Sequence, residues 1–124
     1  MPYQEDYEIH IGTKGPLFRA VPSADDWGLV DKDFESNAAL GKSRLHDEDA
    51  TDFYSVSCFD SFEQARDNAI RFDPRGRRWY GIAEFSNDGD QGHTFAYTYE
   101  PGHWSVWGEP GALRARVVRV LAFR

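Results

Sequence analysis

Short runs in which apolar and polar residues alternate recur along this chain of 124 residues, and they constrain its fold more than any other feature. A period of two places successive side chains on opposite faces of an extended strand. The pattern predicts a sheet of six or seven mainly antiparallel strands. The runs are residues 7–11, 17–21, 53–59, 79–85, 94–99, 103–107 and 114–123, the last of which we expect to be a terminal, mostly buried strand.

One segment shows helical rather than strand spacing. Ser61 and Gln64 form a capping-box pattern, in which each side chain bonds an otherwise unpaired backbone N–H at the start of a helix. Pro74 and Gly76 follow as helix-ending residues. The apolar stripe consists of Phe62, Ala65, Ala69, Ile70 and Phe72. We therefore predict an α+β fold in which the sheet packs on one main helix over residues 61–72.

The region between the second and third predicted strands lacks clear periodicity. Acidic residues dominate residues 23–52, and only a short helix around residues 34–40 is expected there. The remainder is predicted to be an acidic surface loop, of a length that in compact domains is more often functional than idle. The whole chain, residues 1–124, is expected to form one domain.

The aromatic content explains how so short a chain can bury a core. Four Trp, six Tyr and nine Phe make up 15% of the residues, and each ring can remove roughly 150–250 Å² from water. No apolar run approaches the roughly 18 residues of a membrane helix. The first residues are acidic and contain no apolar segment typical of a secretory signal, so we predict a cytoplasmic protein without membrane association.

The charge of the chain argues against a general nucleic-acid binder. The net charge is −7, whereas proteins that neutralise phosphates usually carry a basic excess. The charge is also uneven, with an acidic cluster at Asp47, Glu48 and Asp49 and a basic cluster at Arg77 and Arg78. The acidic cluster is a candidate surface for a basic protein partner, and the alternative is that both clusters are solvated surfaces.

Aromatic residues near the basic cluster suggest a second candidate surface. Trp104 and Trp107 fall on opposite faces of the predicted strand 103–107, so both rings are buried only if both faces are covered. One of them could therefore line a partner surface together with Arg77 and Arg78, because Trp and Arg are favoured interface anchors. The alternative is that both rings pack in the core.

Cysteine and histidine give little support for a reactive or metal site. Cys58 is the single cysteine, so no disulfide can form within the chain. It lies in an apolar run and is predicted to be a buried thiol. The four histidines are scattered without paired ligand spacing, so we predict no metal site.

Three short patches suggest an enzyme as the alternative. Arg19 lies in a strand, Tyr54-Ser55-Val56-Ser57 lies in a later strand before a helix, and Glu84 or Glu109 follows. This order resembles the Arg, Ser-x-Ser and Glu layout of the ADP-ribosyltransferase family. The resemblance implies that Arg19 grips the phosphates of NAD, that Tyr54, Ser55 and Ser57 shape the nicotinamide site, and that Glu109 stabilises the reacting ribose. A guanidinium binds phosphate oxygens through paired hydrogen bonds, and a carboxylate stabilises the positive charge of an oxocarbenium-like centre.

The simpler alternative for these patches is structural. Arg19 would pair with an acidic neighbour, and Ser55 and Ser57 would lie on the outer face of a half-buried strand. In that case no cofactor is expected.

A second similarity spans most of the chain. Leu17–Val21, Ser55-Val56 and the stretch from His103 to Gly108 resemble a pattern in small bacterial single-domain proteins of unknown role. That resemblance implies a compact bacterial domain and no catalytic residues. The leading prediction is therefore a small interaction module that contacts a macromolecular partner through the acidic loop or the aromatic-basic surface. The sequence contains no signal for an oligomeric state.

Overall fold

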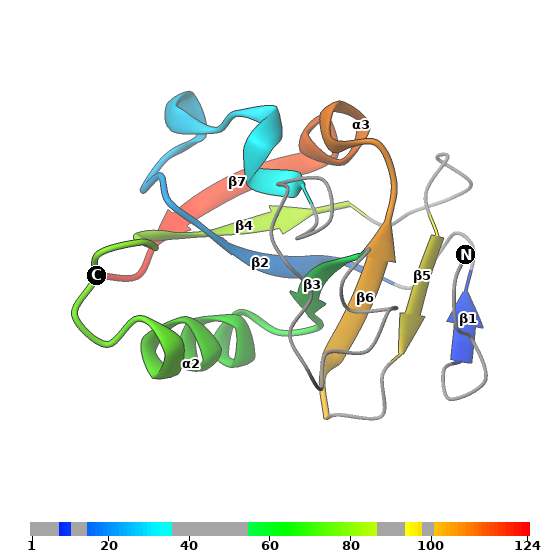
Figure 1. The fold of residues 1–124 in the computed structure, drawn as a ribbon, viewed down its shortest axis with the longest axis horizontal. Helices are drawn as coiled ribbons and strands as arrows, with labels where there is room; N and C mark the ends of the chain where they lie inside the picture. The colour runs from blue at the N-terminus through cyan, green and yellow to red at the C-terminus, as the bar shows by residue number, and fades with distance from the viewer. Residues whose placement is uncertain (1–7, 11–14, 36–54, 87–93, 98–100) are drawn as a thin grey trace, which may run out of the picture.

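The computed structural model describes residues 8–10, 15–35, 55–86, 94–97 and 101–124 (Figure 1). These residues form an α+β structure in which all paired strands are antiparallel, in the order β1-β5-β6-β3-β2-β4-β7. The predicted class and the single main helix are confirmed. The elements are β1 (Glu8–His10), β2 (Leu17–Val21), η1 (Asp26–Gly28), η2 (Asp31–Phe34), β3 (Val56–Phe59), α2 (Phe62–Phe72), β4 (Gly81–Phe85), β5 (Thr94–Tyr97), β6 (His103–Trp107), α3 (Pro110–Arg114) and β7 (Val117–Ala122).

Helix α2 covers one face of the sheet (Figure 1). It begins after Ser61, whose Oγ accepts a hydrogen bond from the backbone N–H of Gln64 at 3.2 Å. Gln64 Oε1 accepts no hydrogen bond within the described residues, so only the Ser61 half of the predicted capping box is formed. The buried helix residues Ala65 and Ala69 are small enough to let the helix approach the sheet.

The second face is covered by the two 3₁₀ turns and by α3. Leu29, Phe34 and Leu113 are buried and pack with core residues of the sheet. The segment after β2 is predicted to be mainly a surface loop, and most of residues 26–34 are exposed, but Leu29 and Phe34 depart from this because their buried side chains contribute to the core. Phe34 ends η2 rather than beginning a helix, and residues 36–40 lie outside the described part of the chain.

The last strand, β7, lies at the edge of the described sheet. It begins at Val117 and not at residue 114 as predicted, because the residues before it form the short helix α3. Pro110 starts the short helix α3, because proline is well tolerated in the first helical turn. The register shifts between Glu84 and Phe85, whose partners are Arg119 and Val117. Val118 therefore bulges out of the ladder and is 60% exposed. The expectation of a mostly buried strand is wrong, since among the described strands β7 pairs with β4 alone and none of its residues is fully buried.

Candidate functional site

The side chain of Arg19 connects two neighbouring strands where their pairing is short. Strands β2 and β3 share a single register pair, Phe18 with Phe59. Beyond it, Arg19 Nη1 donates to the backbone carbonyl of Ser57 at 2.9 Å. Arg19 Nε donates to the backbone carbonyl of Asp33 in η2 at 3.1 Å. The guanidinium is thus tethered to β3 and to the turn that covers this face.

A cavity of about 400 Å³ opens beside this guanidinium. That volume lies within the range of roughly 300–1,000 Å³ occupied by small-molecule sites. Its walls come from β2 and the residues after it, from η2, and from the loop that follows α2. The lining residues are Arg19, Ala20, Pro22, Lys32, Asp33, Glu35, Arg78 and Trp79, which we call the Arg19 pocket.

The Arg19 pocket carries charges of both signs. Three of its side chains are cations and two are carboxylates. Burial lowers the pKa of the Arg19 guanidinium, and the neighbouring charge of Asp33 opposes that shift. An arginine remains protonated in proteins despite such a shift, so the pocket keeps a fixed positive charge.

An aromatic ring stands beside these charges. The guanidinium of Arg78 lies over the ring of Trp79, 4.4 Å from its centroid. At this distance the cation is attracted by the ring quadrupole, which holds the two side chains together.

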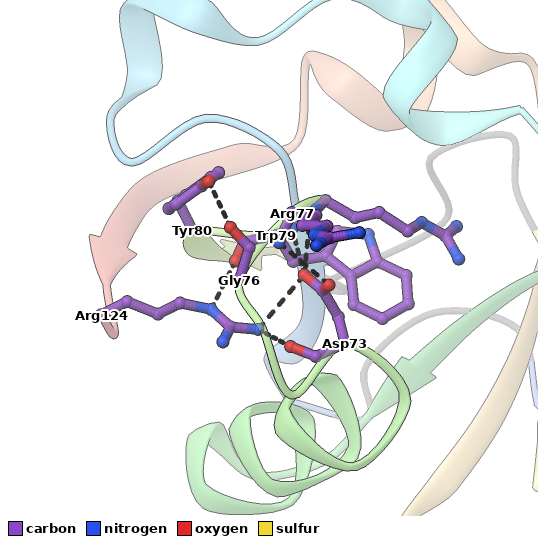
Figure 2. A network of polar contacts seen from close by, with 7 residues as sticks. Asp73, Gly76, Arg77, Trp79, Tyr80 and Arg124 are labelled. Atoms are coloured by element: carbon purple, nitrogen blue, oxygen red, sulfur yellow. Dashed lines mark hydrogen bonds and ion pairs between the residues drawn. The ribbon is translucent and has the colours of Figure 1, made fainter.

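Asp73 fixes the loop that carries Arg78 and Trp79 (Figure 2). Its carboxylate accepts hydrogen bonds from the backbone N–H groups of Arg77, Arg78 and Trp79 at 2.8–3.0 Å. Arg124 Nη2 lies 3.2 Å from the same carboxylate. Burial alone would raise the pKa of Asp73, but the three N–H groups and Arg124 lower it to about 2. Asp73 therefore positions one wall of the Arg19 pocket without lining it.

We expect the stability conferred by Asp73 to depend on pH. Its folded pKa of about 2 lies below the ordinary value of 3.8, so its contribution is present above about pH 4 and is lost as pH falls toward 2. The Asp73→Asn variant should unfold at a lower temperature at pH 7, and its difference from wild type should shrink between pH 4 and pH 2. Thermal unfolding monitored by circular dichroism measures both effects. Asp67→Asn is the control, because Asp67 is exposed and its sequence neighbour Arg66 is its ion-pair partner among the described residues.

Of the residues predicted from the ADP-ribosyltransferase layout, Arg19 and Ser57 are in contact through the Ser57 carbonyl. Ser57 is exposed, Ser55 is buried, and neither lines the pocket. Glu84 forms an ion pair with Arg119 at 3.0 Å. Glu109 precedes α3 and is exposed. Neither glutamate lines the Arg19 pocket, and Tyr54 lies outside the described residues.

The predicted partner-binding residues separate into exposed and buried groups. Arg77 and Arg78 are exposed, as a binding surface requires. Trp104 is only 3% exposed and packs in the core, so it is not a surface anchor. Its neighbours His103 and Ser105 are also buried, because both faces of β6 are covered. Trp107 is half-buried, and the acidic cluster 47–49 lies outside the described residues.

Cys58 is a buried thiol, as expected. It is 0% exposed, and burial raises its pKa to about 12 although the Arg19 charge opposes this. The thiolate is the nucleophilic form of cysteine, so Cys58 is protonated and unreactive at neutral pH.

We expect thiol reagents to distinguish the folded from the unfolded chain. Ellman's reagent should leave native protein unlabelled at pH 7–9 and should label one thiol per chain in guanidinium chloride. Rapid labelling of one thiol in the native protein would contradict the buried position of Cys58.

Sequence reasoning did not place Lys32, Asp33, Glu35 and Trp79 in one site with Arg19. Lys32 did leave a signal, because it interrupts an otherwise acidic run. The turn η2, which brings it beside Arg19, has no periodicity that would have revealed this placement.

Two further findings concern the described residues alone. None of their helices is long and apolar enough to cross a membrane. They also contain no group of three or more His, Cys, Asp or Glu side chains that could hold a metal ion.

Comparisons of the chain with protein-family models, with curated proteins and with solved structures give no match. Function is therefore inferred from the chain's own residues.

Proposed function

We propose that this chain is a binding module and that the Arg19 pocket is where it recognises an anionic group of its ligand or partner. The observation that carries the proposal is the tethered guanidinium of Arg19, which lines a cavity of about 400 Å³ together with Lys32 and Arg78. Two of its hydrogen bonds go to backbone carbonyls. No hydrogen bond from Nη2 to any described residue is present, so this nitrogen has donors for a ligand.

The tethering of Arg19 favours binding. A side chain already fixed in one geometry loses little conformational freedom when a ligand arrives. A guanidinium also presents paired N–H donors that match the two oxygens of a carboxylate or phosphate. Arg77, exposed on the same loop as Arg78, adds positive charge at the surface, which would speed the approach of an acidic partner.

Calorimetric titrations with acetate, inorganic phosphate and a glutamate-rich peptide test this proposal. We expect at least one of them to bind saturably and to bind more weakly as salt concentration rises. Arg78→Gln should reduce binding, whereas Arg75→Gln should not, because Arg75 is exposed on the same loop but does not line the pocket. Equal losses in both variants, or no saturable binding of any probe, would overturn the proposal.

The alternative function is an enzyme similar to ADP-ribosyltransferases. One observation favours it, the contact between Arg19 and Ser57. That function needs a carboxylate at the same cavity, and the residues that line it supply Asp33 and Glu35 in place of Glu84 or Glu109. Calorimetry with NAD on wild type and on Arg19→Ala tests it, and two identical traces without heat of binding would exclude NAD recognition at Arg19.

A further inference from the structure

The charged side chains of the Arg19 pocket form no ion pair with any described residue, although the charge of Asp33 acts on Arg19. The ion pairs among the described residues join Arg66 to Asp67, Arg114 to Asp31, Arg119 to Glu84 and Arg124 to Asp73. None of them includes a charged side chain of the pocket. Oppositely charged groups that line one cavity and remain unpaired leave both signs available to a ligand.

The available groups can be named individually. Lys32 and Glu35 form no side-chain hydrogen bond or ion pair with another described residue. Asp33 uses Oδ2 to accept the backbone N–H of Val30 at 3.0 Å, which leaves Oδ1 for other donors. Arg19 retains Nη2, as described above. The pocket thus offers free cationic donors and free carboxylate oxygens within the same walls.

This combination discriminates between classes of ligand. A polyanion such as a nucleotide would gain from the cations but would be repelled by Asp33 and Glu35. A simple organic cation would face three positive side chains. A molecule with one anionic and one cationic end satisfies both groups, and like-charge contacts of this kind are an effective source of specificity.

The remaining walls are apolar. Ala20, Pro22 and Trp79 also line the cavity. Small-molecule sites typically combine such surfaces with a few polar groups that fix orientation.

We infer that the Arg19 pocket takes a zwitterion of amino-acid to dipeptide size. Its carboxylate would bind Arg19, Lys32 and Arg78, its ammonium would bind Glu35 and Asp33, and its apolar part would contact Trp79. This inference rests on the proposed function, because it names the class of anionic ligand recognised at the same pocket.

Three matched probes test the inference by calorimetry on the full chain. Gly-Phe carries both charges, N-acetyl-Gly-Phe keeps only the carboxylate, and Gly-Phe amide keeps only the ammonium. We expect Gly-Phe to bind at least about tenfold more tightly than either neutralised form, since each of those forms loses the hydrogen bonds that one charged end of Gly-Phe makes. AMP is included as a polyanion and should bind more weakly than Gly-Phe.

The Glu35→Gln variant locates the ammonium. It should weaken binding of Gly-Phe about tenfold and leave binding of N-acetyl-Gly-Phe unchanged. Glu63→Gln is the control, since Glu63 is an exposed residue of α2 outside the pocket. Thermal unfolding of both variants checks that they are folded.

The outcomes separate the two proposals. If N-acetyl-Gly-Phe binds as tightly as Gly-Phe, or if AMP binds while neither dipeptide does, the zwitterion inference is wrong and anion recognition at Arg19 stands. If no anionic probe binds, both proposals are wrong. If Gly-Phe binds equally well to wild type and Glu35→Gln, the ammonium does not use Glu35 and the inference falls.

Discussion

Replacing Phe34 by alanine should lower the free energy of unfolding by about 3–5 kcal/mol, the range found when a buried Phe is truncated. Phe34 is 2% exposed and packs in the core with residues such as Leu17 and Val21. Its loss leaves a cavity that the surrounding sheet can only partly fill. Chemical denaturation with guanidinium chloride measures the change.

A second aromatic residue in the same region provides the control. Trp27 lies in η1 and is 96% exposed, so Trp27→Ala should change stability by no more than about 0.5 kcal/mol. Similar effects of the two substitutions would contradict the placement of the turns η1 and η2 against the sheet. Since η2 also carries Lys32 and Asp33, the Phe34→Ala variant should bind ligands of the Arg19 pocket less tightly.

Replacing Arg19 by methionine should weaken binding of a carboxylate ligand by about 10- to 100-fold. Loss of a hydrogen bond to a charged group lowers the binding free energy by about 1.5–3 kcal/mol, which corresponds to this change in affinity. Methionine retains the unbranched length of the side chain but has no donor. Calorimetry with Gly-Phe and with acetate gives the dissociation constants.

The Arg19→Lys variant separates charge from geometry. Lysine keeps the positive charge but lacks the planar set of donors that bonds both the Asp33 and the Ser57 carbonyls. Its binding should therefore fall between those of wild type and Arg19→Met. Unchanged binding in Arg19→Met, with the fold intact, would show that the guanidinium does not contact the ligand.

The sheet was largely predictable because its signal is local. Alternation alone predicts β2 over residues 17–21 and places Trp104 and Val106 on one face, and both positions are as observed. The helix α2 was predictable for the same reason, since its Ser61 cap and the spacing of Ala65 and Ala69 are local signals. The predicted apolar stripe is only partly buried, because Ile70 is 43% and Phe72 is 61% exposed.

Features set by distant contacts were not predictable. The bulge at Val118 arises from the register of β7 against β4, and alternation within one strand cannot show it. Leu29 and Phe34 are buried because their turns fold back over the sheet, although the surrounding sequence is acidic. A core formed by tertiary packing overrides such local composition.

The Arg19 pocket depends on a local sequence signal and also on contacts between distant parts of the chain. Arg19 lies in the middle of an apolar strand, and the resemblance to ADP-ribosyltransferases implies that it binds a phosphate, with pairing to an acidic neighbour as the alternative. Its actual neighbours Lys32 and Glu35 come from the residues of η2 and just after it, and Trp79 comes from a loop held by Asp73. Neither placement is encoded in the spacing of these residues along the chain.

The most direct test of the central claim is a nuclear magnetic resonance titration of ¹⁵N-labelled protein with Gly-Phe. The side-chain Nε–H of Arg19 and the indole N–H of Trp79 should shift together and saturate at the same ligand concentration, while the indole N–H of the exposed Trp27 stays in place. Shifts at Trp27 without shifts at Arg19 and Trp79, or a spectrum unchanged at saturating ligand, would contradict the assignment of the Arg19 pocket as the binding site.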